Sequence, residues 1–397
     1  MKFTSKFLIL ALAAVPAQAG AKSEPALMPA ARVNAMAFKF YAAEARKEGN
    51  IFFSPYSLHT AFAMVYEGAK GPTAKEIAAV FSFPPALRDG LGALGKDLKE
   101  AAKGAEFAQA NSLWAQEDYR FLPAYTGLLS RKYDAEARAA NFKTASEVSR
   151  RAINAWTEEH TKGKIKDLFA EGALTPLTRL VLVNAVYFKG TWLQPFTKAM
   201  TGEAEFTKAD GQKIKTQMMT FSGTRDLQYG ETVSFQVLRL PYGGGGLSML
   251  LALPKDGTKL SDAGKKLTPA ALEEMRASLA EQKVKVFLPR FTFSSGFDLN
   301  AELAALGMPK AFTDAADFSG MDGTRNLYIQ RAVHKAFVEV NEEGTEAAAA
   351  TGVAMGLKSA SFGFALFRAD RPFIFFIEEK KTGLLLFMGR MEDPSRN

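Results

Sequence analysis

Residues 342–351 read Glu-Glu-Gly-Thr-Glu-Ala-Ala-Ala-Ala-Thr and directly follow a strong strand pattern at residues 332–341. Glycine at position 344 gives the backbone the rotational freedom that a hinge needs. Of the seven residues after it, only Glu346 has a long side chain, and none is proline or a large apolar residue. Such a segment buries little surface where it stands, but it could enter a narrow gap between two strands. The pattern therefore favours a loop that inserts into a sheet.

The composition is that of one large globular domain. The chain has 397 residues, of which 47% are hydrophobic, 11% aromatic and 23% charged. This length would suit two or three domains, but no linker and no internal repeat divides the chain. We therefore predict a single domain over residues 20–397.

The N-terminus has the three parts of a secretory signal peptide over residues 1–19. Lys2 and Lys6 supply the basic part, residues 7–15 are apolar, and Ala17-Gln18-Ala19 is a small-x-small cleavage site. Cleavage is predicted between Ala19 and Gly20. The apolar run is too short to span a bilayer, and no other segment suggests a membrane span. We expect a secreted or periplasmic protein.

The absence of cysteine and the scattered distribution of charge exclude or disfavour several classes of function. With no cysteine, thiol redox catalysis and cysteine-based zinc sites are excluded. The net charge of +8 falls by two if the signal peptide is removed, and the basic residues are not interleaved with aromatic ones. Surface charge explains this pattern better than nucleic-acid binding does.

No catalytic or metal-binding motif stands out. The three histidines, His59, His160 and His334, have no metal-ligand spacing, and no G-x-S-x-G motif is present. The glycine run at residues 243–246 lacks the Lys-Ser/Thr of a phosphate-binding loop. On this ground we expect that the protein is not an enzyme and that it binds no metal and no cofactor.

His334 lies on an unusual strand face. Alternation places His334, Ala336, Val338, Val340 and Glu342 on the same side of the strand. Buried polar groups need partners, so this histidine is either a satisfied core residue or a hydrogen-bonding latch, which is itself a structural role.

Helices are expected early in the chain and strands late, which predicts an α+β fold without a parallel nucleotide-binding sheet. The predicted helices cover residues 31–47, 57–68, from 73 onward, 86–103, 121–132, 146–161, 268–280 and 297–306. Thr73-x-x-Glu76 predicts a capping box at the start of the third helix. The predicted strands cover residues 179–192, 234–242, 247–254, 283–293, 332–342, 371–379 and 383–391.

Several dispersed motifs together resemble the serpin family over residues 31–394. They appear in the family's order, and although each is weak alone, their combination is specific. They are NIFFSPYS at 50–57, NAWT at 154–157 with TKGKI at 161–165, LVNAVYFKGTW at 182–192, LPRF at 288–291, VHK at 333–335, the 342–351 segment, ADRPF at 369–373 and FMGR at 387–390.

The resemblance implies three β-sheets, eight or nine helices and an exposed reactive loop at about residues 343–367. It also implies a monomeric suicide inhibitor, in most cases of a serine protease. The protease would cleave the loop and become acylated. The cut loop would then insert into the central sheet and distort the protease. A non-inhibitory serpin acting as a chaperone or carrier is the alternative.

The family's loop geometry places the cleaved bond between Lys358 and Ser359. Lysine there favours a trypsin-like protease, whose specificity pocket carries an acid. Leu357 or Met355 would instead suit chymotrypsin- or elastase-like enzymes, and a cysteine protease is a further alternative.

The resemblance also implies a hinge at the start of the loop. It comprises Glu342, Glu343, Gly344, Thr345, Glu346, Ala347, Ala348, Ala349, Ala350 and Thr351. Of these, Thr345, Ala347, Ala349 and Thr351 would point inward and Glu346, Ala348 and Ala350 outward.

Two further groups of residues match the family. Ser54, Ser57, Asn184 and His334 correspond to a polar cluster that controls opening of the central sheet. Trp192, Arg290 and Glu342 correspond to the site where the loop first enters, with an expected ion pair between Arg290 and Glu342.

Overall fold

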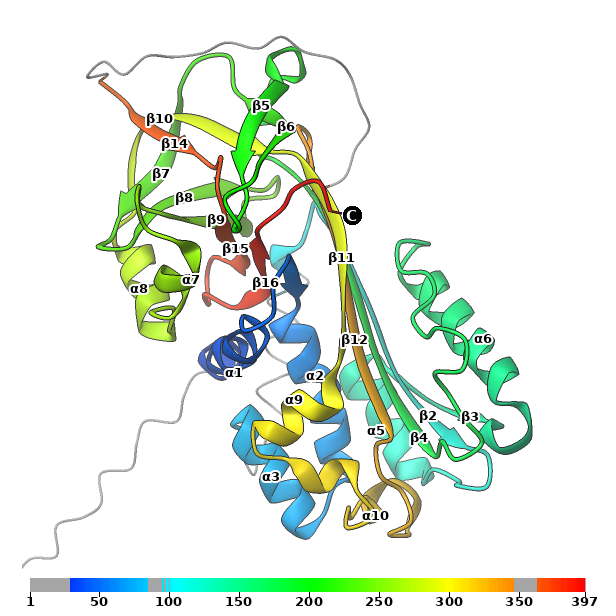
Figure 1. The fold of residues 1–397 in the computed structure, drawn as a ribbon. Coiled ribbons are helices and arrows are strands. Elements are labelled where there is room, and N and C mark those ends of the chain that lie inside the picture. The colour runs from blue at the N-terminus through cyan, green and yellow to red at the C-terminus, as the bar shows by residue number, and fades with distance from the viewer. Residues whose placement is uncertain (1–28, 85–94, 96–97, 99, 346–362, 397) are drawn as a thin grey trace, which may run out of the picture.

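The computed structural model describes residues 29–84, 95, 98, 100–345 and 363–396. Its strands form two hydrogen-bonded sheets, and helices gather around them (Figure 1). The α+β class predicted from the sequence is confirmed.

The smaller sheet contains β2 and β4, the longest strands among the described residues. Its order is β11-β12-β4-β2-β3, with the two-residue β13 paired to the end of β4. The bounds are β2 Ala105–Gln116, β3 Glu136–Ala140, β4 Leu180–Thr191, β11 Phe291–Asp298, β12 Arg331–Val340 and β13 Gly344–Thr345. We call it the central sheet.

The larger sheet runs in the order β1-β16-β15-β9-β8-β7-β10-β6-β5, and β14 pairs with β10. The bounds are β1 Ile51–Phe53, β5 Gly202–Thr207, β6 Lys213–Thr220, β7 Arg225–Glu231, β8 Phe235–Pro241, β9 Leu247–Pro254, β10 Ala280–Pro289, β14 Ala365–Arg368, β15 Phe373–Glu379 and β16 Leu385–Met391. Two of the three expected sheets share β10, which pairs with β7 through its first half and with β6 at its end. They therefore count as one ten-stranded sheet.

Helices cover the central sheet on both faces. The long α6 lies on one side of the strands, while α1, α2 and α9 lie on the other (Figure 1). The α-helices of the described residues are α1 Pro29–Glu44, α2 Pro55–Gly68, α3 Gly71–Phe81, α5 Pro123–Tyr133, α6 Phe142–His160, α7 Leu260–Gly264, α8 Pro269–Ala277, α9 Leu299–Ala305 and α10 Ser319–Asp322. Two 3₁₀ helices, η1 Lys198–Met200 and η2 Pro309–Phe312, complete the set.

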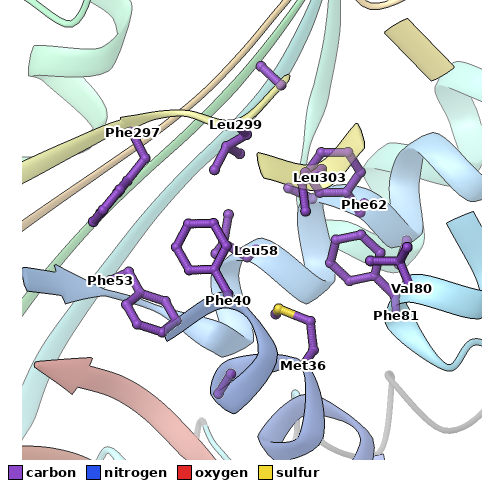
Figure 2. Close-up of a cluster of buried hydrophobic side chains, with 14 of the residues drawn as sticks. Met36, Phe40, Phe53, Leu58, Phe62, Val80, Phe81, Phe297, Leu299 and Leu303 are labelled. Atoms are coloured by element: carbon purple, nitrogen blue, oxygen red, sulfur yellow. The ribbon is translucent and has the colours of Figure 1, made fainter. Parts of the chain in front are cut away.

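Apolar side chains from both helices and strands form the core on the side of the central sheet where α1 and α2 lie. Figure 2 shows Phe40 from α1, Phe62 from α2, Phe81 from α3 and Phe297 from β11 around one cluster. Phe62 stacks on Phe81 with ring centroids 4.8 Å apart. Because helix and strand residues share this cluster, α2 is fixed against the sheet, and the polar residues at its N-terminus are fixed with it.

The predicted strand at residues 283–293 is wrong as a single element. β10 ends at Pro289 in the larger sheet and β11 begins at Phe291 in the central sheet, so the chain changes sheets at Arg290. The Arg290 N–H donates to the Gln217 carbonyl oxygen at 2.8 Å, which fixes the corner. Alternation alone could not show this change, because apolar residues line both strands.

The capping box predicted at Thr73 and Glu76 is also wrong. Helix α3 begins two residues earlier, at Gly71, so Thr73 lies inside its first turn. Its hydroxyl accepts from the Asp317 N–H at 2.9 Å, and the Glu76 carboxylate accepts from the Lys310 N–H at 3.0 Å. Both side chains hold the following segments of the fold instead of capping their own helix.

Candidate functional site

The candidate site is the line along which β4 and β12 pair, which we call the seam. The two strands run parallel, and seven residue pairs join them, from Val181–Arg331 to Tyr187–Phe337. No described strand lies between them. The remaining strand pairs of the central sheet are antiparallel except β2–β3, so the seam divides two antiparallel halves. A segment inserted there could run antiparallel to both neighbours.

The described part of the hinge, residues 342–345, lies at the end of the seam nearest to the Tyr187–Phe337 pair. Gly344 pairs with Thr191 and Thr345 with Gly190, antiparallel to β4. Gly344 has a φ of 151°, and a Cβ added there would lie 2.0 Å from the Gly190 carbonyl oxygen. Glycine is therefore required for close approach to β4 as well as for conformational freedom.

The expected ion pair between Arg290 and Glu342 is present at this end of the seam. The Arg290 Nη2 group donates to both carboxylate oxygens of Glu342, at 2.5 and 2.6 Å. Thr201 adds a third bond at 2.7 Å. The Glu342 side chain is 2% exposed and that of Arg290 29%. Burial alone would raise the pKa of Glu342, but the hydrogen bonds from Thr201 and Arg290 outweigh it and hold this pKa below its ordinary value.

Trp192 holds the backbone on either side of Glu342. Its Nε1 donates to the Asn341 carbonyl oxygen at 2.9 Å, and its backbone N–H donates to the Glu343 carbonyl oxygen at 2.8 Å. The indole stacks on Tyr242 with centroids 4.6 Å apart. Trp192, Arg290 and Glu342 thus meet at the start of the hinge, as expected.

The four predicted polar residues also meet, on the face of the seam that α2 covers. The Ser54 N–H donates to His334 Nε2 at 3.0 Å, and Asn184 Nδ2 donates to Ser57 Oγ at 2.6 Å. His334 Nδ1 is hydrogen-bonded to Asn184 Oδ1. All four side chains are fully buried. Because Asn184 and His334 are paired residues of β4 and β12, their bond closes the seam directly.

The network determines the state of the histidine. A backbone N–H can only donate, so His334 Nε2 is the acceptor and Nδ1 carries the proton given to Asn184. Burial lowers the pKa of His334 to about 3, so the ring is neutral at physiological pH.

Two members of the cluster were missed in the sequence. Asn111 on β2 accepts from Asn184 Nδ2, and Gln109 donates to Ser57 Oγ at 2.9 Å. Asn111 is the residue paired with Asn184. A polar residue within the buried half of strand 105–116 was the available signal, but no pattern linked it to residue 184.

Several expected residues lie outside the described part of the chain. They are the signal peptide at 1–19, the hinge residues Glu346, Ala347, Ala348, Ala349, Ala350 and Thr351, and the candidate cleavage positions Met355, Leu357, Lys358 and Ser359. Within the described ranges, no cluster of three or more potential metal ligands occurs and no helix is long and apolar enough to cross a membrane.

Comparison with protein families gives one match across almost the whole chain. Residues 31–394 match the family model described as serpin (serine protease inhibitor). The chain is 41% identical to serpin B6 of Macaca fascicularis, over 87% of this chain and 93% of that protein. It is 40% identical to the leukocyte elastase inhibitor of Bos taurus, with the same coverage.

Solved structures agree with this match. Uncleaved ovalbumin superposes with a TM-score of 0.83 at 30% identity, over 92% of this chain and 99% of that one. The fold expected from the sequence motifs is confirmed.

The prediction that the protein is not an enzyme is corrected in its basis by the family match. It rested on missing catalytic motifs, and an absence of motifs does not decide the function. The findings that bear on it are positive ones: the matching family is described as serine protease inhibitors, and one relative is named a leukocyte elastase inhibitor.

Replacing Glu342 by Gln should destabilise the protein, because it leaves the partly buried guanidinium of Arg290 without its counter-charge. We expect a loss of about 1–3 kcal/mol in the free energy of unfolding. The matched control is Glu343→Gln, since Glu343 is adjacent but 43% exposed. It should cost at most about 0.5 kcal/mol. Urea unfolding of both variants checks this, and equal losses would show that the buried pair is not the anchor.

Acid should destabilise the fold through two buried histidines. Burial lowers the pKa of both His334 and His59 to about 3, below the value of about 6.5 in the unfolded chain. The unfolded state therefore binds more protons between these values, and stability falls as the pH drops below about 6.5. At pH 5 the loss is about 2 kcal/mol per histidine.

The variant His334→Gln isolates one of these contributions. Between pH 7.5 and 5 its unfolding free energy should fall by about 2 kcal/mol less than that of the wild type. Urea unfolding across this range measures the difference, and parallel pH profiles would mean that His334 does not stay neutral.

Proposed function

The chain belongs to the serpin family, and on this basis we propose that it is a suicide inhibitor of a serine protease. The observation that carries the proposal is the strand pairing at the seam. β4 and β12 are paired to each other, while β13 already pairs with β4 at a point separated from that ladder only by Phe188 and Lys189. Gly344 and Thr345 of the hinge are thus aligned to continue down the seam.

The β13 register predicts where the rest of the hinge would go. Gly344 pairs with Thr191 and Thr345 with Gly190, so continued pairing would place Ala348 opposite Tyr187 and Thr351 opposite Asn184. Directly opposed residues share a face of the sheet. Thr345, Ala347, Ala349 and Thr351 would then face the core and the polar cluster, which is the inward set expected from the sequence.

This register also accounts for alanine on the other face. Ala348 and Ala350 would lie level with Tyr187 and Ala185, on the face that α6 covers. Val183 and Ala185 of β4 pack in the same cluster as Trp156 and Ile153 of α6. An inserted segment would therefore meet packed side chains on both faces, so small residues are needed at consecutive positions.

The proposed chemistry consumes one peptide bond of the loop. The protease serine oxygen attacks the Lys358 carbonyl carbon, the bond to Ser359 breaks, and Ser359 leaves as a free amine after taking up a proton. Lys358 is then held as an ester on the protease. Insertion of about 14 residues, at about 3.3 Å each, would carry the ester about 45 Å along the sheet before water can cleave it.

A trypsin-like target follows from Lys358 as the residue that supplies the acyl group. An elastase- or chymotrypsin-like target is the second candidate. Leu357 and Met355 would suit it, and one relative is named a leukocyte elastase inhibitor. We further propose that the protein is exported through residues 1–19 and acts as a monomer.

Mixing the purified protein with trypsin should give a complex that survives SDS and has the summed mass of one protease and the large inhibitor fragment. Mass spectrometry of the released C-terminal peptide identifies the cleaved bond, which should lie after Lys358. Elastase is run in parallel. A loop that is cleaved by both enzymes without any stable complex would refute the inhibitor proposal and favour a non-inhibitory serpin.

Ala349→Glu provides the matched loop variant. The charged side chain would have to enter the core face of the seam, which is costly, so cleavage should proceed while complex formation falls at least about tenfold. A full yield of complex from this variant would contradict insertion with this register.

A further inference from the structure

A short segment after α6 crosses the seam on the face opposite the polar cluster. Residues 161–166, which we call the strap, leave the helix through a tight turn in which Lys162 and Gly163 have φ of 53° and 75°. The Gly163 N–H donates to the Glu158 carbonyl oxygen at 2.8 Å, and the Ile165 N–H donates to Thr161 Oγ1 at 3.2 Å. The strap therefore has a defined conformation of its own.

The strap is attached on both sides of the seam. Lys162 Nζ donates to a carboxylate oxygen of Glu106 on β2 at 2.6 Å. Lys335 Nζ of β12 donates to the Lys166 carbonyl oxygen at 2.9 Å. Lys164 lies between these two attachments, so its side chain is held over the seam itself.

Lys164 contacts one aromatic ring from each strand of the seam. Its Nζ lies 6.0 Å from the ring centroid of Tyr187 on β4 and 5.7 Å from that of Phe337 on β12. The two ring centroids are 6.3 Å apart. Tyr187–Phe337 is the last pair of the β4–β12 ladder on the hinge side, and hence the first that an inserting segment must separate.

This shared contact cannot survive insertion. A strand placed between β4 and β12 would move them apart by about 4.8 Å. The two ring centroids would then lie up to about 11 Å apart. An ammonium group held at its present height over the rings would be more than about 6 Å from both centroids, the distance beyond which a cation–π contact weakens. Ala348 would pass directly beneath the strap at this level.

We infer that Lys164 is a positioning residue. It stabilises the closed pairing of β4 and β12 at the Tyr187–Phe337 end and so limits the rate at which the hinge segment inserts. This inference rests on the proposed function, since it assumes that the seam opens. Lys164 would then be the second contact that stabilises the closed pairing of β4 and β12. His334 and Asn184 close the seam on the α2 face, and Lys164 closes it on the α6 face, three residues nearer to the hinge.

The test measures insertion without any protease. A fluorescent synthetic peptide with the sequence of residues 345–357 is incubated with the intact protein, and its uptake is followed on native gels. Four proteins are compared: the wild type, Lys164→Met, Lys164→Arg and Lys166→Met. Lys164→Met keeps the length of the side chain but removes the charge, and Lys164→Arg keeps a cation that can stack on rings. Lys166 serves as the neighbouring control because its ammonium group lies 3.3 Å from Glu158 on α6.

Lys164→Met should take up the peptide about fivefold faster than the wild type, the change expected from losing a cation–π contact at the barrier. Lys164→Arg and Lys166→Met should stay within about twofold of the wild type. Equal rates for Lys164→Met and the wild type would overturn the inference, as would failure of all four proteins to take up the peptide. The trypsin experiment reports separately on the proposed function, because it requires a stable complex whatever the uptake rates are.

Discussion

The pairing of β4 with β12 is the interaction on which the rest of the structure depends. Seven residue pairs join these strands, fewer than the eight pairs of β11–β12 and the eleven pairs of β2–β4 that lie on either side of the seam. The parallel direction of the pair leaves room for one more strand that would be antiparallel to both. A closed seam of this kind is a single pairing that could be exchanged for two new ladders.

The residues around the seam are suited to holding it closed without making it permanent. On the α2 face, His334 and Asn184 exchange a side-chain hydrogen bond across the two strands and are anchored to Ser54 and Ser57. At the hinge end of the seam, Arg290 holds the side chain of Glu342 and Trp192 holds the backbone beside it. These contacts are polar and directional, so they can be broken one at a time, whereas a continuous apolar interface would resist opening along its whole length.

Much of this arrangement could be predicted from the sequence because it follows from local pattern. The alternation in strand 332–341 placed His334 on the buried face, and the run of small residues after Gly344 indicated insertion. The partners of His334 and of Arg290 came from the motifs of the family instead.

What the sequence could not show depends on register between distant strands. Asn111 joins the polar cluster only because β2 pairs with β4 at that residue. The close approach of Gly344 to Gly190, and the position of Lys164 over two rings, likewise require the three-dimensional pairing. The change of sheet at Arg290 was hidden because both flanking strands are apolar.

The central claim is that the intact protein keeps a strand position unfilled at the seam and is held in that state kinetically. The most direct measurement is thermal unfolding before and after cleavage of the single peptide bond between Lys358 and Ser359. The account predicts that the cut chain, with both fragments still associated, unfolds at a much higher temperature, because the freed segment has added a strand to the central sheet. An unfolding temperature that is unchanged or lower after the cut would contradict it.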